Sequence, residues 1–405
     1  MEKGLKIKAN KVLWVATGVN FITGLIYIWS VISNSLITEL NWTSKEASLP
    51  YTVLTIFFVI AMVISGKIQD IKGPRLTATI GSILMGSGLI LSGLITNPQM
   101  MIISIGLITG TGVGMINVST APPVVKWFPP EKKGMVTGIV VAGVGISAVL
   151  YSPLANYLTN TVGISKTLIY IGAGALLSSV LLSQFLENPP SDMIHGDNIS
   201  KDKSKPGRDK VKDFDWLEMV KHKNFFKLWL MLAFSAAAGL MIIGHISNIT
   251  EIQVGWQAGF VLVILLSIFN TLGRVLGGVL SDKIDRVTLL RMVFILQAIN
   301  MFAFSRYTSV ALISIGVAIT GLCYGAGFSV FPAILSDSYG TKHFGVNYGV
   351  LFTAWGLGGV IGPMTAAIMI DSTNSYNAAF LTASALLILA VLISFTIKKK
   401  DMENN

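Results

Sequence analysis

Charged residues are scarce in this chain of 405 residues: Asp, Glu, Lys and Arg together make up 12% of it, against about a quarter of a soluble domain. Hydrophobic residues make up 52%, and the mean hydropathy is +0.69. Cys323 is the only cysteine, which excludes a disulfide framework and a cysteine-held metal cluster. The four histidines include no His-x-x-x-His pair. This composition predicts a polytopic membrane protein.

The sequence patterns of enzymes are also lacking. We find no phosphate-binding loop, nucleophile triad or metal-ligand constellation, and we therefore expect neither enzymatic activity nor a cofactor. The run Gly110-Thr-Gly-Val-Gly114 superficially resembles a dinucleotide-binding loop, but it follows no strand and lies in an apolar stretch. We interpret it as a site of close helix packing.

Twelve apolar stretches approach or exceed the ~20 residues that a helix needs to cross a bilayer. They cover residues 12–32, 51–69, 76–96, 100–125, 134–157, 166–186, 226–249, 257–281, 288–305, 310–335, 345–370 and 377–397. We therefore predict an all-α polytopic membrane protein with a first six-helix half (1–186), a polar linker (187–225) and a second six-helix half (226–405). Within the linker, the apolar residues between Phe214 and Val220 predict a short amphipathic segment on the membrane surface.

Basic residues gather on one side of the predicted topology. Of the 30 Lys and Arg residues, 26 fall on the side that holds both termini and the linker, while Lys45, Lys166 and Arg306 fall on the other side. The positive-inside rule places both termini in the cytoplasm, and we expect the plasma membrane as the location. Loops facing anionic lipid account for the net charge of +10 without a nucleic-acid partner.

The two halves repeat each other. Gly66 and Asp70 recur 212 residues later as Gly278 and Asp282, and seven other glycines and prolines recur at offsets of 210 or 211. A parallel repeat of this kind predicts a ligand site between the halves, near the middle of the bilayer.

The repeated loops also carry a motif. Residues Gly66-Lys-Ile-Gln-Asp-Ile-Lys-Gly-Pro-Arg75 resemble the Gly-x-x-x-Asp-x-x-Gly-x-Arg motif of the major facilitator superfamily, and Gly278-Val-Leu-Ser-Asp-Lys-Ile-Asp-Arg286 is its second copy. The resemblance implies that superfamily's fold, with twelve transmembrane helices in two six-helix pseudo-repeats. We interpret Asp70, Arg75, Asp282 and Arg286 as gating residues, because a carboxylate can face the positive N-terminus of a helix in the other half. The alternative is a charged turn without a gating role.

Further motifs narrow the family. The run Trp127-Phe-Pro-Pro-Glu-Lys-Lys-Gly-Met-Val-Thr-Gly138, the run Ala142-Gly-Val-Gly145 and the run Phe344-Gly-Val-Asn-Tyr-Gly349 resemble the oxalate/formate antiporter and monocarboxylate transporter families. The resemblance covers nearly the whole chain. It implies a carrier of small organic anions, and it identifies a family rather than a substrate.

Arg274 is a charged residue inside an apolar stretch. It lies eight residues before Asp282, roughly 12 Å along a helix from the membrane surface, where a cation costs at least ~2.5 kcal/mol. A guanidinium fits a carboxylate with two parallel hydrogen bonds, and the resemblance implies that this arginine binds the carboxylate of the substrate. The alternative is a structural arginine bound to backbone carbonyl groups.

Other candidates for the substrate site come from the resemblance and from their depth in the membrane: Tyr27, Trp29, Asn117, Val144, Tyr324, Phe328 and Trp355. A tyrosine hydroxyl or an asparagine amide can donate to a substrate oxygen, while an aromatic wall excludes water. For each of these residues, the alternative is a packing role.

Two departures from the resembled families bear on the substrate and its coupling. Trp355 stands where oxalate/formate antiporters have a lysine for a second carboxylate, so a dianion would keep one charge unpaired in a dry site. Asn270 stands where animal monocarboxylate transporters have an aspartate associated with proton coupling, and an amide cannot take up that proton. His245 is a second candidate for coupling, with a hydrogen-bonded structural histidine as the alternative.

We therefore expect a monomeric secondary transporter of small monocarboxylate anions such as pyruvate, lactate or formate. Transport would follow alternating access in the lipid bilayer, either in exchange for a counter-anion or together with a proton. One alternative is a carrier of another organic anion: oxalate, another small di-acid, an aromatic acid or a sugar acid. A second alternative is a carboxylate sensor that does not transport.

Overall fold

The computed structural model describes residues 2–190, 213–256 and 260–397, which form helices and loops without a strand. Eleven helical stretches in this part of the chain are long and apolar enough to cross a membrane. One of them, residues 130–183, has 54 residues and would extend about 80 Å as a single straight helix. Gly163 divides it, with a φ of 79° that interrupts the helix. The eleven stretches therefore make twelve crossings, as the sequence predicts.

The first half contains six crossings. The first crossing is α1 (Glu2–Thr23), a 3-10 helix (Gly24–Ile28) and α2 (Trp29–Leu40) in succession. The next two are α3 (Ser44–Lys72) and α4 (Pro74–Leu94). The fourth combines α5 (Pro98–Met101), a π-helical segment (Ile102–Thr109) and α6 (Gly110–Trp127), and the long helix α7 (Lys133–Ser183) supplies the last two.

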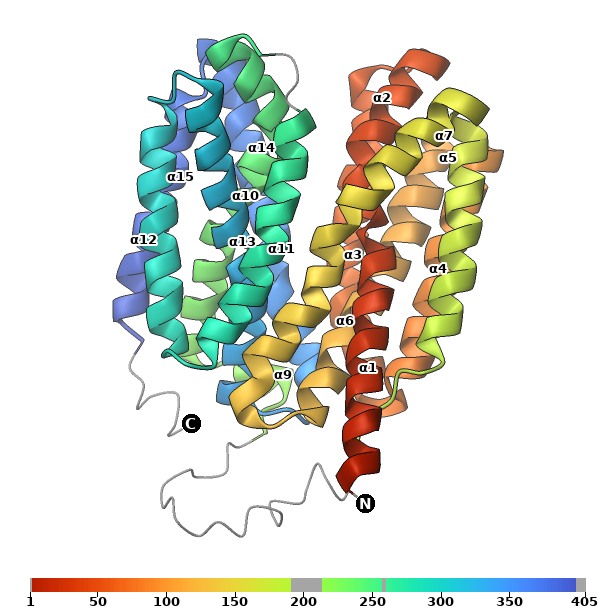
Figure 1. Cartoon of the computed structure of the whole chain (residues 1–405), viewed down its shortest axis with the longest axis vertical. Helices are drawn as coiled ribbons and strands as arrows, with labels where there is room; N and C mark the ends of the chain where they lie inside the picture. Colours follow the sequence, from red (N-terminus) through yellow and green to blue (C-terminus); the bar gives the residue numbers. More distant parts are fainter. Residues whose placement is uncertain (1, 191–212, 257–259, 398–405) are drawn as a thin grey trace.

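The second half follows the short helix α9 (Trp216–Met219). Its crossings are α10 (Lys223–Val254), α11 (Phe260–Ser281), α12 (Arg286–Phe304), α13 (Val310–Tyr339), α14 (Phe344–Thr373) and α15 (Asn377–Phe395). The halves stand side by side, with α7 of the first half packed against α11 of the second (Figure 1). The bundle face where α1 begins and α15 ends is called the terminal face below, and the opposite one is called the far face.

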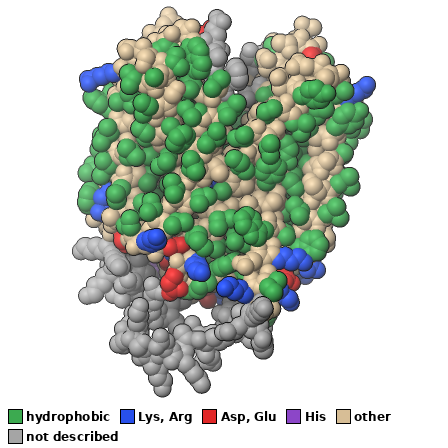
Figure 2. Space-filling model, viewed as in Figure 1, with side chains coloured by type: hydrophobic (Ala, Val, Ile, Leu, Met, Phe, Trp, Pro, Cys, Tyr) green, Lys and Arg blue, Asp and Glu red, His purple; other side chains and the backbone are tan. Residues whose placement is uncertain are grey.

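Side-chain polarity divides the surface into zones. Hydrophobic side chains cover the middle of the bundle, and many Lys, Arg, Asp and Glu side chains gather at the terminal face (Figure 2). Large apolar side chains of the spans are turned outward, among them Leu177 and Leu181 of α7, each 65% exposed. Such an apolar band matches the hydrocarbon layer of a bilayer.

Glycines allow the closest helix contacts, including those of the run Gly110–Gly114. A Cβ atom added to Gly110 would lie 2.7 Å from the carbonyl oxygen of Leu54 on α3, and one added to Gly112 would overlap the backbone of Met85 on α4. This finding confirms the interpretation of the run as helix packing. This close packing holds α6 between α3 and α4.

The segment between Phe214 and Val220 differs from the expected amphipathic surface helix. Phe214 and Met219 are buried in the protein. The backbone N–H of Phe214 donates to the carbonyl of Tyr339 at 3.1 Å, and the Asn347 side chain donates to the carbonyl of Phe214 at 3.0 Å. The expectation is therefore wrong for Phe214 and Met219, because the start of this segment is bound to the end of α13 and the first turn of α14.

Candidate functional site

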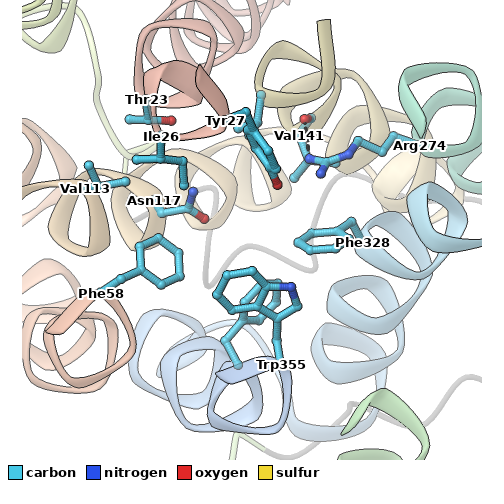
Figure 3. A pocket seen from close by; sticks show the side chains of 12 residues that line it. Thr23, Ile26, Tyr27, Phe58, Val113, Asn117, Val141, Arg274, Phe328 and Trp355 are labelled. Atoms are coloured by element: carbon cyan, nitrogen blue, oxygen red, sulfur yellow. Dashed lines mark hydrogen bonds between the residues drawn. The ribbon is translucent and has the colours of Figure 1, made fainter. Parts of the chain in front are cut away.

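A cavity lies between the two halves. Together with the open solvent that adjoins it, it comprises about 420 Å³. Its lining residues are Thr23, Ile26, Tyr27, Phe58, Val113, Asn117, Val141 and Val144 from the first half, and Arg274, Phe328, Phe352 and Trp355 from the second half. The wall is thus mainly aliphatic and aromatic, with few polar groups (Figure 3).

Arg274 supplies the charge of this cavity. Its side chain enters from α11 (Figure 3), and the residue is 1% exposed. Its Nε donates to Asn270 Oδ1 at 2.8 Å and its Nη1 donates to the Val141 carbonyl at 2.6 Å. The guanidinium carbon lies 4.4 Å from the ring centroid of Phe328, in cation–π contact. The Nη2 atom has no hydrogen-bond partner within the described parts of the chain.

No carboxylate pairs with Arg274 among the residues that the structure describes. The ion pairs found there join Asp70 to Lys126, Lys133 and Arg286 to Asp337, and Arg286 to Asp282. Arg274 therefore brings an uncompensated positive charge into the bundle, which is costly in a medium of low dielectric constant. An anion that binds Nη2 would relieve both the unpaired charge and the unmet hydrogen bond.

The guanidinium also joins the two halves. Arg274 belongs to α11 of the second half, and the carbonyl of Val141 belongs to α7 of the first half. The two helices pack closely where they cross, since a Cβ added to Gly138 of α7 would overlap the carbonyl oxygen of Arg274. A change in the relative position of the halves would therefore alter the bonding of this guanidinium.

Two polar side chains of the first half face the same space. Asn117 on α6 and Tyr27 on the 3-10 helix point into the cavity (Figure 3). Neither the Asn117 amide nor the Tyr27 hydroxyl has a hydrogen-bond partner in the described structure. Both groups are available to a ligand that is bound at Arg274, which keeps the prediction for these residues open to test.

Of the residues proposed from sequence, Arg274, Asn117, Tyr27, Phe328, Trp355 and Val144 line the cavity together. Tyr324 and Trp29 do not line it. Tyr324 lies behind Trp355 and accepts a hydrogen bond from its indole Nε1 at 2.8 Å. Trp29 donates to the carbonyl of Ala47 at 3.2 Å and stacks on Tyr51, with ring centroids 6.0 Å apart.

The two coupling candidates have different surroundings. Asn270 is buried and its amide oxygen orients Arg274. His245 lies outside the cavity lining: one ring nitrogen is 3.2 Å from the Tyr376 hydroxyl, and the other is 3.2 Å from the carbonyl of Pro363. This geometry matches the hydrogen-bonded structural histidine that the sequence left as an alternative.

The carboxylates at the ends of α3 and α11 face the opposite halves. Asp70 accepts the backbone N–H groups of Gly345 and Val346 on α14, each at 3.0 Å, and we call this the α3 contact. Asp282 accepts those of Gly134 and Met135 on α7 at 2.8 and 2.7 Å, and we call this the α11 contact. Both carboxylates meet the first turn of a helix, where the free N–H groups favour negative charge.

The basic residues beside these contacts differ. Lys126 is 3.7 Å from Asp70, whereas Arg286 is 3.5 Å from Asp282 and 3.1 Å from Asp337. Arg75 is exposed and forms no ion pair with any described residue. Burial raises the pKa of Asp282 above its ordinary value, although the N–H groups of the α11 contact act in the opposite direction.

The sequence did not single out six residues of the cavity lining: Thr23, Ile26, Phe58, Val113, Val141 and Phe352. Phe58 could have been found, because it stands 212 residues before Asn270, in the register of the repeat. Phe352 is three residues before Trp355 and shares its helix face. Val141 contributes a backbone carbonyl, for which the residue type gives no signal.

The fold and the cavity can now be compared with known proteins. The sequence model of the Major Facilitator Superfamily matches residues 13–304 and 235–405. The chain belongs to this superfamily. Among solved structures, the major facilitator proton:xylose symporter XylE bound to 6-bromo-6-deoxy-D-glucose is similar, with a TM-score of 0.78 at 15% identity over 97% of this chain and 96% of that one. The expected twelve-helix major facilitator fold is therefore confirmed.

Three relatives within the superfamily have names that refer to anions. The oxalate:formate antiporter of Oxalobacter formigenes is 25% identical, over 93% of this chain and 88% of the antiporter. The probable nitrate transporter NarT of Staphylococcus haemolyticus is 24% identical, over 92% and 93%. Monocarboxylate transporter 13 of Rattus norvegicus is 25% identical, over 78% and 71%. The resemblance to the oxalate/formate antiporter and monocarboxylate transporter families is thereby confirmed, and the superfamily consists of transporters rather than enzymes.

Proposed function

We propose that the chain is a secondary transporter of small monocarboxylate anions, such as pyruvate, lactate or formate, and that Arg274 pairs with the carboxylate. One observation carries this proposal: the unpartnered Nη2 of Arg274 on the wall of a cavity between the two halves. A single guanidinium neutralises one anionic group, and the surrounding aromatic wall suits a small apolar remainder. Asn117 and Tyr27 are in place to donate to a further oxygen of the ligand.

The charge of the cavity also bears on the coupling. In alternating access the site must close before it opens to the other side, and closure around a bare cation is costly. A bound monoanion removes that cost. This reasoning favours exchange of one anion for another over return of the empty carrier. Asn270 supplies no titratable group beside Arg274, so the structure offers less support for co-transport of a proton through that pair.

Other anions remain as a second candidate class. Nitrate is a planar monoanion that one guanidinium can also bind, and one relative has the name of a probable nitrate transporter. Oxalate has a second carboxylate, which would face the apolar ring of Trp355 rather than a cation. A sensor that binds the acid without transport is a further possibility, which counterflow of labelled substrate in pure liposomes would exclude.

We also infer the setting of the transporter. The excess of basic residues supports a cytoplasmic terminal face in the plasma membrane. The α3 and α11 contacts would then hold the cytoplasmic side closed, and they would act as gates that open when the halves change position. We propose a monomer with the first half, the linker and the second half bounded as predicted from the sequence.

The test replaces Arg274 by glutamine, which keeps a polar side chain with N–H donors but removes the charge. In proteoliposomes loaded with unlabelled pyruvate, we expect Arg274→Gln to insert normally and to lose saturable uptake of labelled pyruvate by at least ~100-fold. Arg306→Gln is the matched control, because Arg306 lies at the far face and contacts Phe302. Normal uptake by Arg274→Gln would sink the assignment of the site.

A competition panel on the unmodified protein separates the anion classes. Acetate, pyruvate, oxalate and nitrate are added in turn to the exchange assay. Stronger competition by acetate and pyruvate supports the proposal. Stronger competition by nitrate or by oxalate would identify that class of anion as the substrate instead. The role of Arg274 would then be tested with the new substrate.

A further inference from the structure

Trp355 closes the cavity on the side of the second half. The residue lines the cavity and is 8% exposed. Its ring meets the edge of Phe58 at a centroid distance of 5.5 Å and that of Phe328 at 6.5 Å. Phe328 in turn contacts the guanidinium of Arg274. The orientation of the Trp355 ring therefore determines how much space is left for the part of a bound anion that points away from Arg274. It also determines which chemical groups that part contacts.

Tyr324 fixes that orientation from behind. Its hydroxyl oxygen accepts the Nε1–H of Trp355 at 2.8 Å, and the residue is itself 4% exposed and outside the cavity lining. Its ring packs against Phe328 at a centroid distance of 5.1 Å. On its other side it lies against Gly239 of α10, where an added Cβ would overlap the ring. Tyr324 is thus confined by neighbours from three helices, and this confinement also fixes the hydrogen bond that it accepts from Trp355.

We propose that Tyr324 is a positioning residue that sets the selectivity of the site, and that Gly239 makes room for it. By accepting the indole N–H, Tyr324 keeps the one donor of Trp355 away from the ligand. In the cavity, the carboxylate of an anion then meets one guanidinium, and the rest of the anion meets an apolar ring. The site thereby selects short anions with a single charge. This inference rests on the proposed function and specifies which anions that function admits.

The physical reason lies in the hydrogen bonding of indole. The tryptophan side chain has a single donor and no acceptor, and a buried donor without a partner is unfavourable. Without the Tyr324 hydroxyl, the indole N–H gains by turning toward the cavity, where water or a second carboxylate can accept it. Such a turn also removes the fixed wall opposite Arg274. Loss of this one hydroxyl should therefore relax selection against both a second charge and a longer chain.

The experiment measures selectivity in reconstituted protein. Wild type, Tyr324→Phe and Gly239→Ala exchange labelled pyruvate, and unlabelled acetate, malonate and hexanoate compete. We expect the inhibition constants of malonate and hexanoate, relative to acetate, to fall about fivefold or more in Tyr324→Phe, as the loss of one neutral hydrogen bond implies. Gly239→Ala should shift the ratios in the same direction, because its methyl group displaces the Tyr324 ring.

Matched controls separate this role from general loosening of the protein. Tyr307→Phe removes a hydroxyl that donates to Asn300 at 3.1 Å, away from the cavity lining. Gly174→Ala adds a methyl group where no atom lies within 4 Å. Both controls should keep the wild-type ratios. In a Trp355→Phe background, Tyr324→Phe should change the ratios no further, because the indole on which Tyr324 acts is gone.

The outcomes are distinguishable. If wild type exchanges pyruvate and Tyr324→Phe keeps the wild-type ratios, the inference is overturned and the proposed function stands. Equal shifts in Tyr324→Phe and Tyr307→Phe would also overturn it, as would an undiminished effect of Tyr324→Phe in the Trp355→Phe background. If no carboxylate competes and wild type does not exchange pyruvate, the proposed function itself has failed, and the inference fails with it.

Discussion

Helices α3 and α11 hold equivalent places in the two halves, and their sequences can be aligned by the offset of 212 residues. Each has a carboxylate at its C-terminal end that faces the opposite half: Asp70 in the last turn of α3, and Asp282 directly after α11. Eight residues earlier they diverge, because α3 has the buried Met62 where α11 has the buried Arg274. The contacts at the terminal face are therefore common to both halves, whereas the charge of the cavity belongs to one half alone.

The divergence continues one turn further along the helices. Phe58 of α3 is the counterpart of Asn270 of α11, and it contributes an aromatic wall where Asn270 orients the guanidinium. Among the described residues of the first half, α7 alone bonds to the guanidinium, through the Val141 carbonyl that accepts from Arg274. The two halves repeat each other in the fold, but the site is asymmetric: both halves supply walls, the second half supplies the cation, and the first half supplies the carbonyl acceptor.

The largest expected effect comes from abolishing that asymmetry. Arg274→Met gives α11 the residue that α3 has, and we expect at least ~100-fold loss of anion exchange. The thermal stability of the purified protein should stay equal or rise by about 1–3 kcal/mol, since an apolar side chain replaces a buried, unpaired charge. Exchange kinetics and thermal unfolding in detergent check the two parts. A marked loss of stability would mean that Arg274 serves the fold, not the ligand.

The fold was accessible from sequence because its signals are local and repeated. Apolar stretches of membrane length and the pair Asp70 and Asp282 depend on composition and spacing alone, and twelve crossings were predicted on that basis. Gly163 fits this pattern, because its positive φ divides α7 between the predicted stretches 134–157 and 166–186.

The site was accessible only in part. A lone arginine in an apolar stretch is a strong signal, since its cost demands a reason. The placement of Tyr324 behind Trp355, and not beside the ligand, depends on which way each ring turns, and helical spacing does not determine this. The acceptor at Val141 is a backbone carbonyl from the other half. Tertiary packing alone brings it to the guanidinium.

The next prediction compares the α3 and α11 contacts. In Asp70→Asn the ammonium of Lys126 would lose its partner while its side chain is 6% exposed, so we expect a destabilisation of about 3 kcal/mol. In Asp282→Asn the guanidinium of Arg286 keeps Asp337 at 3.1 Å. Because this second carboxylate keeps the guanidinium paired, we expect a smaller loss in Asp282→Asn, about 1 kcal/mol. Thermal unfolding of both variants under one condition measures the difference, and equal losses would contradict the comparison.

A smaller effect concerns the neighbour of the cation. Asn270→Asp would place a carboxylate within 2.8 Å of Arg274 Nε and neutralise the site without a ligand. We expect the KM for anion exchange to rise about tenfold, with a smaller change in the maximal rate. Asn270→Leu is the control, because it removes the amide without adding charge. If both variants raise KM equally, orientation rather than charge explains the role of Asn270.

The smallest expected effect concerns the linker, which supports only the α3 contact. Asp213 accepts the backbone N–H groups of Thr341 and Lys342 at 2.9 and 3.0 Å, a few residues before the N–H groups that bind Asp70. Asp213→Ala should therefore weaken the first turn of α14 by about 1 kcal/mol. Spin labels at Lys67→Cys and Lys342→Cys, two exposed positions in opposite halves, should then report a larger fraction of long distances across the terminal face.

Asp215→Ala is the matched control for the linker. Asp215 has the same charge two residues later, but its carboxylate caps α9 and does not reach the loop before α14. If the linker only connects the halves, the two variants will give the same distances. If Asp213 holds the first turn of α14 in place, only Asp213→Ala will lengthen them. The ion pairs of Arg286 and Lys133 with Asp337 stabilise the α11 contact. The distances from Asp282 to Gly134 and Met135 should therefore stay unchanged in both variants.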